Sequence, residues 1–184
     1  LMRSSAASDV YKRQRMKNRP SKFFRGFKFA FRGVIHCINN ERNMRFHTAV
    51  MLYVLVFSPF FTLTKTQYAV LILTISSVIS AEMLNTAAEE LADLSAADYN
   101  PLARAAKDIA AGAVLVCAFF SVVVGAVILW QPDAFARIFR FFLDKPWMLA
   151  VTLAATVLIA VYVAKGPLWI GRAFARWAGK VRKR

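Results

Sequence analysis

Apolar side chains recur every three or four residues over residues 20–40, and basic side chains occupy positions between them. A helix of 3.6 residues per turn places residues with this spacing on one face. The apolar positions are Phe23, Phe24, Phe27, Ala30, Phe31, Val34, Ile35 and Ile38, and the basic positions are Lys22, Arg25, Lys28 and Arg32. The pattern predicts an amphipathic helix that lies in a membrane interface, where anionic lipid would help to hold it.

Four longer apolar runs follow, over residues 46–63, 67–93, 109–130 and 146–164. Each run predicts a spanning helix, because about 20 apolar residues cross the hydrocarbon core of a bilayer. Residues 134–143 predict a short amphipathic helix between the last two runs. We therefore expect an all-α integral membrane protein with an N-terminal amphipathic surface helix, a transmembrane core of three helices, and an extra C-terminal helix that is transmembrane or interfacial.

The composition supports a membrane protein. The 184-residue chain is 58% hydrophobic, with 25 Lys and Arg against 10 Asp and Glu, whereas soluble domains are about 45–50% apolar. A net charge of +15 also suits nucleic-acid binding. A soluble nucleic-acid-binding protein would not carry apolar runs of this length, so we expect no nucleic-acid partner. Cys37 and Cys117 lie in different contexts, and nothing predicts a disulfide or a metal site there.

The chain falls into three segments. Residues 1–15 do not begin with methionine and lack the apolar run of a signal peptide, so we interpret them as a non-native or disordered tail. Residues 16–131 hold the surface helix and the first three apolar runs. Residues 132–184 form a C-terminal extension with an apolar helix and a basic tail.

Lysine and arginine concentrate on the cytoplasmic side of membrane proteins, which predicts the orientation. Eight of them lie within residues 16–45 and seven lie within residues 165–184. The first connection has only Lys65, whereas the third has Arg137, Arg140 and Lys145, which weakens the contrast without reversing it. Four spans then place both chain ends, and the polar region over residues 89–107, on the cytoplasmic side of the plasma (inner) membrane.

Polar side chains gather at the end of the second apolar run. Glu82, Asn85, Glu89 and Asp93 fall at i, i+3, i+7 and i+11, so a helix places all four on one face. Three carboxylates and an amide at a membrane boundary are costly unless they are paired or used. The stripe is therefore a candidate functional site.

Carboxylates, an amide and a nearby lysine predict Mg²⁺-dependent phosphate chemistry on a lipid. Glu41 and Glu89 suit Mg²⁺, which prefers carboxylate oxygens together with phosphate and water. Lys107 can pair with phosphate oxygens. Glu82 is the deepest of the acids, which suits a general base for a lipid hydroxyl at that depth. The chain has no GxxxxGK[ST] loop, so it is not a P-loop enzyme.

Three segments resemble the small prokaryotic diacylglycerol kinase family, and its undecaprenol kinase branch most closely. They are ERNMRFH at 41–47, EMLNTAAEELAD at 82–93 and PLARAAKDIAAGAVL at 101–115. The resemblance covers residues 23–130. It implies a membrane lipid-kinase domain over residues 16–131 that uses ATP with Mg²⁺ to phosphorylate a lipid alcohol. It also implies a homotrimer with active sites between subunits.

The resemblance assigns roles to residues by motif position. It implies that Glu82 is the catalytic base, that Glu41 and Glu89 are metal ligands, that Asp98, Tyr99, Asn100, Lys107 and Asp108 contact the nucleotide, and that Asn85, Asp93 and Arg45 are supporting polar residues. The usual chain of the family ends near Trp130. The extension over residues 132–184 therefore has no family motif to explain it.

Two alternatives stay open. Undecaprenol is the expected acceptor and diacylglycerol the alternative within the same chemistry, because the motifs cannot separate two lipid alcohols. A non-enzymatic transporter subunit, in which intramembrane acids relay protons, belongs to a different class. A proton pathway needs acids at successive depths, whereas most of these acids cluster on one side of the membrane, and this favours the kinase.

Overall fold

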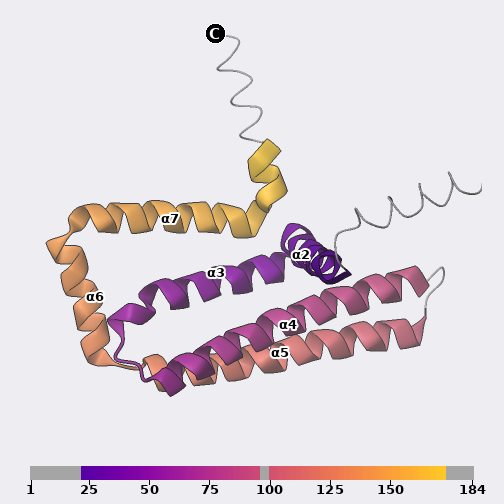
Figure 1. The fold of residues 1–184 in the computed structure, drawn as a ribbon, viewed down its shortest axis with the longest axis horizontal. Helices are drawn as coiled ribbons and strands as arrows, with labels where there is room; N and C mark the ends of the chain where they lie inside the picture. The colour runs from indigo at the N-terminus through magenta and orange to yellow at the C-terminus, as the bar shows by residue number, and fades with distance from the viewer. Residues whose placement is uncertain (1–21, 96–99, 173–184) are drawn as a thin grey trace, which may run out of the picture. The chain divides into compact units, whose positions relative to one another are not determined.

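The computed structural model describes residues 22–95 and 100–172 of the chain (Figure 1). Every regular element in this part of the chain is a helix, as the sequence predicted. The chain divides into two compact units, Leu1–Ile35 and His36–Arg184, and each is described by itself.

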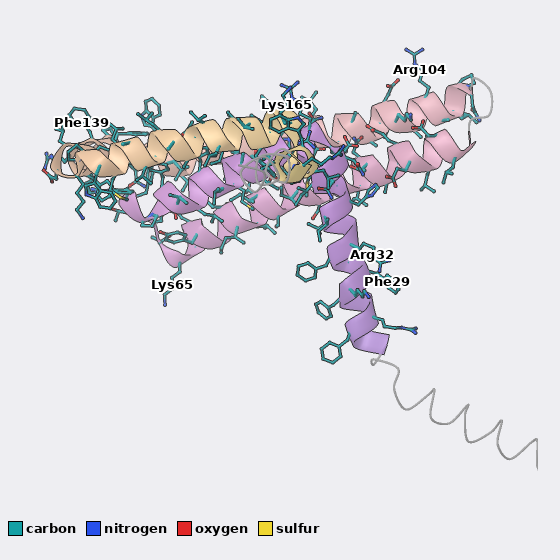
Figure 2. All side chains as sticks on the ribbon, turned by 90° about the horizontal axis from the view of Figure 1, so that it is seen from above. Phe29, Arg32, Lys65, Arg104, Phe139 and Lys165 are labelled. Carbon is teal, nitrogen blue, oxygen red and sulfur yellow. The ribbon has the colours of Figure 1, made fainter. Side chains whose placement is uncertain are left out.

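Helix α2 (Lys22–Asn40) confirms the predicted amphipathic helix and belongs to the first unit over most of its length. Phe24 and Phe31 are both 68% exposed. Phe29 lies on the same side as Arg32, whose guanidinium carbon is 5.4 Å from the centroid of the Phe29 ring (Figure 2). A helix with an exposed aromatic face and basic side chains is suited to a lipid interface.

Helix α3 (Arg42–Phe57) ends before the apolar run over residues 46–63 does. Pro59 has no amide hydrogen for the carbonyl of Leu55, and Ser58 Oγ donates to that carbonyl instead, at 2.9 Å. The chain continues as a short 3₁₀ helix, η1 (Ser58–Phe60). At 16 residues, α3 is about 24 Å long, which is less than the roughly 30 Å of a hydrocarbon core.

Helices α4 (Lys65–Ser95) and α5 (Pro101–Leu129) pack against each other along their length (Figure 1). A capping box starts α4, since Thr64 Oγ1 accepts from the Gln67 amide at 3.2 Å and Gln67 Oε1 accepts from the Thr64 amide at 2.8 Å. Both helices are about 45 Å long, so part of the hairpin extends beyond the hydrocarbon core.

Helix α6 (Pro132–Asp144) confirms the short amphipathic helix and connects α5 to α7 (Pro146–Lys165). Figure 2 shows Phe139 of α6 and Lys65 at one end of the second unit and Arg104 at the other. Arg137 Nε donates to the carbonyl of Phe60 at 2.8 Å, which ties α6 to the end of η1. Because α6 joins two helices of spanning length, we place it at the membrane surface.

Three of the described helices, α4, α5 and α7, are long and apolar enough to cross a membrane. The expectation of four such helices is therefore corrected, because α3 alone is too short. Helix α3 and η1 together nevertheless run beside α7. Arg45 contacts Val163 near the end of α7, and the Phe60 and Phe141 ring centroids lie 5.2 Å apart just before α7 begins. The 3₁₀ turn adds about 6 Å to the roughly 24 Å of α3, so the two together are about as long as the hydrocarbon core is thick.

Candidate active site

The polar stripe of α4 is buried at its membrane-facing end. Glu82 is 1% exposed, Thr86 3% and Asn85 7%. Thr86 Oγ1 donates to the backbone carbonyl of Glu82 at 3.0 Å, which keeps the threonine hydroxyl within its own helix. The stripe predicted from helical spacing is confirmed, and its deepest carboxylate is enclosed by protein.

His47 of α3 faces Glu82 of α4. The Nε2 atom of His47 lies 3.3 Å from Glu82 Oε1, and the two side chains are 19% and 2% exposed. Within residues 22–95 and 100–172, Glu82 Oε1 has no hydrogen-bond partner of regular geometry. The two atoms are therefore in contact without an aligned hydrogen bond in this structure. Hydrogen bonds at active sites often tighten only when substrate binds.

Asn85 and Glu89 continue the stripe toward the polar end of α4. Asn85 Nδ2 donates to Glu89 Oε1 at 2.8 Å. The other polar atom of the amide, Asn85 Oδ1, is buried and has no partner in the described part of the chain. A buried acceptor without a donor is unusual, because leaving it unpaired costs about 1–3 kcal/mol. The site therefore has an oxygen available for a further hydrogen-bond donor.

Glu41 approaches the stripe from the junction of α2 and α3. It occupies the N-cap position of α3 with an extended backbone, φ −97° and ψ 122°. Glu41 and Glu89 both interact electrostatically with Glu82. Glu41 and Glu89 therefore lie close enough to Glu82 for their charges to act on it, and this concentration of negative charge favours a cation.

The donor set is compatible with Mg²⁺ but does not form a complete metal cage. Among the residues that the structure describes, no three His, Cys, Asp or Glu side chains converge closely enough to hold a metal ion. Mg²⁺ usually takes only one or two protein carboxylates and completes its octahedron with phosphate and water. Glu41 and Glu89 can supply two carboxylates, so the residues present fit an ion that arrives with a nucleotide.

Ion pairs lie at the exposed end of the α4–α5 hairpin. Lys107 Nζ contacts Asp93 Oδ1, which joins the two helices, and His36 Nε2 contacts Glu90 Oε1. Asp108 is exposed beside Lys107. The structure thus brings Lys107 and Asp93 together, as two of the predicted site residues.

The turn between α4 and α5 holds three more of the predicted nucleotide contacts. Asp98 and Tyr99 lie outside the described residues. The Oδ1 atom of Asn100 accepts from the amides of Leu102 at 2.9 Å and Ala103 at 3.4 Å, so this side chain caps α5. The cap begins α5 at the point where the hairpin turns.

Arg45 was predicted to be a supporting site residue, and the structure gives it backbone partners. Arg45 is 7% exposed. Its Nε donates to the Val163 carbonyl, and its Nη1 donates to the carbonyls of Ile38 and Asn39, all at 3.1 Å. Arg45 therefore connects the end of α2, the start of α3 and the end of α7.

Cys37 lies at the end of α2 beside Thr86. Burial raises the pKa of the Cys37 thiol above its usual value. A raised pKa leaves little thiolate at neutral pH, and thiolate is the reactive form. We therefore interpret Cys37 as a packing residue rather than a nucleophile.

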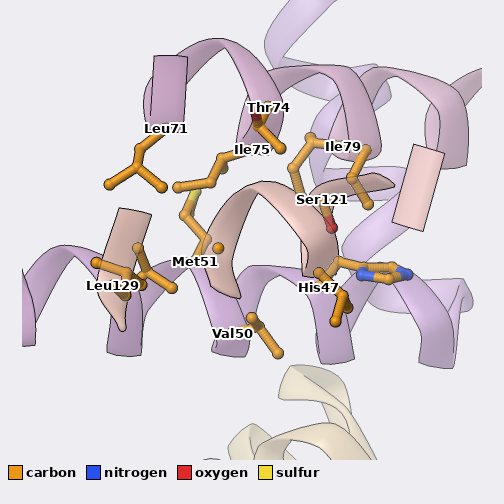
Figure 3. Close-up of a pocket in the computed structure, with 13 residues that line it drawn as sticks. His47, Val50, Met51, Leu71, Thr74, Ile75, Ile79, Ser121 and Leu129 are labelled. Atoms are coloured by element: carbon orange, nitrogen blue, oxygen red, sulfur yellow. The ribbon is translucent and has the colours of Figure 1, made fainter. Parts of the chain in front are cut away.

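An apolar groove of about 200 Å³ runs between α3, α4 and α5. Figure 3 shows His47 at one end of the groove and Leu129 at the other. Most of the lining side chains are aliphatic, and the polar ones are His47, Thr74 and Ser121. The groove therefore leads from an apolar region to the histidine that contacts Glu82.

Sequence reasoning did not single out His47 or Thr86 as parts of the site. The available signal for His47 was its place in the ERNMRFH segment, six residues after Glu41. Helical spacing could not reveal its contact with Glu82, because the contact depends on how α3 packs against α4.

A family model described as prokaryotic diacylglycerol kinase matches residues 28–129. An undecaprenol kinase from Bacillus subtilis (strain 168) is 39% identical over 112 residues, which are 61% of this chain and 91% of the relative. A diacylglycerol kinase from Synechocystis sp. is 40% identical over 107 residues, which are 58% of this chain and 61% of that relative.

The family match covers α3, α4 and α5 and ends at Leu129, so α6 and α7 lie outside it. It includes every residue of the stripe, together with Glu41, His47 and Lys107. Helices of membrane-spanning length and a carboxylate cluster with an adjacent apolar groove agree with this match. The chain belongs to the prokaryotic diacylglycerol kinase family, and it is a membrane lipid kinase that transfers a phosphoryl group from a nucleotide to a lipid.

Proposed function

We propose that the lipid acceptor is undecaprenol and that the product is undecaprenyl phosphate. The observation that carries this proposal is the polarity of the groove. Thr74 Oγ1 donates to the Val70 carbonyl at 2.7 Å and Ser121 Oγ donates to the Ala118 carbonyl at 2.8 Å, so both hydroxyls are engaged within their own helices. A polyprenol tail has no ester groups and needs no donors along the groove.

Diacylglycerol would place two ester carbonyls near the reacting hydroxyl. A buried carbonyl without a donor loses the hydrogen bonds that it makes with water, at a cost of about 1–3 kcal/mol. His47 is the polar lining residue beside the site, and its Nε2 atom faces Glu82, so it is not free to donate to an ester carbonyl. The lining therefore favours an acceptor whose hydroxyl is its only polar group. The identities to the undecaprenol kinase and the diacylglycerol kinase are nearly equal, but the match spans 91% of the former and 61% of the latter, which supports the same choice.

Glu82 acts as the general base in this proposal. As the acceptor hydroxyl attacks the γ-phosphorus of ATP, its proton moves to Glu82 and a new oxygen–phosphorus bond forms. The bond between the γ-phosphorus and the bridging oxygen breaks, and ADP leaves with that electron pair. Glu82 returns its proton to solvent when the product departs. The burial of Glu82 suits this role, because the carboxylate is enclosed by protein and contacts His47, which lines the end of the groove.

Glu41 and Glu89 would hold Mg²⁺ in the proposed complex, and the ion would neutralise phosphate charge. Asn85 orients Glu89 through its 2.8 Å hydrogen bond. Lys107 lies at the exposed end of the hairpin, where its ammonium can pair with phosphate oxygens of the nucleotide, and Asp93 holds it there. Asp98, Tyr99, Asn100 and Asp108 complete the proposed nucleotide contacts by motif position.

The proposed orientation counts α3 together with η1, about 30 Å in all, as a crossing beside α4, α5 and α7, and it then places both chain ends and the nucleotide on the cytoplasmic side. Lys and Arg are enriched before α3 and after α7. Arg137, Arg140 and Lys145 lie on the opposite side and count against this orientation. The hydrogen bonds of Arg137 to Phe60 and Thr62 give one of the three a structural use there. A structural arginine carries less weight as a topology signal.

We further propose a homotrimer with active sites between subunits. Leu94 is 84% exposed and Leu102 is 80% exposed. Both lie at the polar end of the α4–α5 hairpin, which is longer than the hydrocarbon core. Beyond the hydrocarbon core, lipid tails do not cover these two leucines. Contact with another copy of the chain would bury them.

The acceptor is tested by competition in one membrane. We would reconstitute the full chain in nanodiscs that contain undecaprenol and dioleoylglycerol at equal mole fraction, and supply ATP labelled on its γ-phosphate. We expect undecaprenyl phosphate to exceed phosphatidic acid at least about tenfold, which corresponds to about 1.4 kcal/mol and matches the loss of one buried carbonyl hydrogen bond. Phosphatidic acid as the main product would assign the acceptor to diacylglycerol instead.

A further inference from the structure

Glu82 occupies a place where a carboxylate is costly to hold as an anion. It is 1% exposed, and the negatively charged Glu41 and Glu89 both act on it. A buried charge needs a hydrogen-bonding partner of suitable polarity, because the protein interior replaces water poorly. A base that must remain deprotonated between turnovers therefore needs a donor in this position.

His47 is placed to be that donor. Its Nε2 atom lies 3.3 Å from Glu82 Oε1, and Glu82 Oε1 has no aligned hydrogen-bond partner in the described part of the chain. A neutral imidazole with its proton on Nε2 would donate to this oxygen and would add no charge to the site. The same imidazole lines the end of the apolar groove (Figure 3). The acceptor hydroxyl would therefore meet the pair rather than Glu82 alone.

Two features restrict where the His47 ring can lie. Its own helix is anchored two residues earlier, where Arg45 donates to three backbone carbonyls of α2 and α7. The Phe46 ring meets the imidazole edge to face, with 5.5 Å between the centroids. A His47 ring with restricted movement can in turn restrict the Glu82 carboxylate, and precise catalytic geometry requires such support.

We propose that His47 is a positioning residue, which donates from Nε2 to Glu82 Oε1 and holds the carboxylate toward the acceptor hydroxyl at the mouth of the groove. This inference rests on the proposed role of Glu82 as base. His47 takes no proton from the substrate and touches no reacting atom. Its loss therefore lowers turnover through the misplacement of Glu82, and the binding of ATP is unaffected.

His47→Gln and His47→Asn test whether the position of the hydrogen-bond donor matters, because both variants keep a polar group at position 47. The glutamine amide nitrogen reaches the place of Nε2, whereas the shorter asparagine places its nitrogen near Nδ1. We expect His47→Asn to lower kcat about ten- to hundredfold, because a displacement of about 1 Å at a catalytic group has effects of that order. We expect His47→Gln to retain most of the activity and both variants to keep the KM for MgATP within about twofold.

The measurement uses the full chain in nanodiscs with undecaprenol and γ-labelled ATP, with the thermal midpoint recorded for each variant. Activities of both variants equal to the parent would overturn the inference. Equal losses in both variants would overturn it as well, because the position of the donor would then not matter. A change in the KM for MgATP at constant kcat would assign His47 to nucleotide binding instead.

A double variant tests whether His47 acts through Glu82. In the Glu82→Gln background, His47→Asn should lower the remaining transfer no further, because the group that it positions is gone. An additional tenfold loss in the double variant would contradict the inference. Full activity of Glu82→Gln alone would instead overturn the proposed base, so the two failures are distinguishable.

Discussion

Replacement of Glu82 by glutamine should lower phosphoryl transfer about 10²- to 10⁴-fold while the affinity for MgATP stays within about twofold. General-base catalysis contributes a factor of that order, and glutamine keeps the shape of glutamate but accepts no proton. Glu82 is 1% exposed and precedes Glu89 by seven residues, about two helical turns, so it lies apart from Lys107 and the other proposed nucleotide contacts at the end of the hairpin. Initial rates with undecaprenol and equilibrium binding of a fluorescent ATP analogue would measure the two effects separately.

Glu90 provides the matched control. It lies on the same helix, is exposed, and contacts His36 at the surface. Glu90→Gln removes one negative charge from α4 just as Glu82→Gln does, and we expect its rate to stay within about threefold of the parent. A loss of similar size in both variants would show that net charge, rather than the group at position 82, determines the rate. Retention of more than a tenth of the activity by Glu82→Gln would remove its role as base.

Replacement of Arg45 by methionine should lower the free energy of unfolding by about 2–4 kcal/mol. Arg45 is 7% exposed, and its guanidinium donates to the carbonyls of Ile38, Asn39 and Val163. Methionine fills a similar volume without donors, so these carbonyls lose charge-assisted hydrogen bonds of about 1.5–3 kcal/mol each, in part replaced by water. Unfolding of the full chain by SDS in mixed micelles, followed by circular dichroism, would measure the change.

Arg42 controls for the charge in this experiment, because it is exposed on the first turn of the same helix. Arg42→Met should change the free energy of unfolding by less than about 0.5 kcal/mol. If both substitutions destabilise the protein equally, the contacts of Arg45 are not what holds α7 against α3.

Gly166 follows the end of α7 and lies against the same guanidinium. Its φ is +77°, and a Cβ atom added to it would lie 3.3 Å from Arg45 Nη1. The backbone conformation and the close approach therefore both favour glycine at this position.

Helical periodicity was enough to predict α2, α4, α5, α6 and α7, because each has a continuous apolar or amphipathic pattern. The residue at which α3 ends was harder to predict. Residues 46–63 form a continuous apolar run, and hydropathy does not distinguish an α-helix from a 3₁₀ turn or an extended segment. The decisive residue was Pro59, whose missing amide hydrogen ends the α-helical bonding pattern.

The stripe of α4 could be predicted because it depends on one helix only. The partners of Glu82 and Arg45 could not, since they depend on the register between helices. His47 reaches Glu82 across the packing of α3 against α4. Arg45 binds backbone carbonyls, which every sequence supplies, and one of its acceptors lies 118 residues away in the extension. No spacing rule within a helix indicates such a contact.

The direct-transfer mechanism is tested most sharply by the stereochemical course at phosphorus. ATP made chiral at its γ-phosphate with oxygen isotopes would be used by the purified chain to phosphorylate undecaprenol, and the configuration of the product would be determined. A single in-line displacement, with Glu82 as base, predicts inversion. Retention would contradict it, because two successive displacements would mean that a side chain such as His47 or Glu82 carries the phosphoryl group before the lipid does.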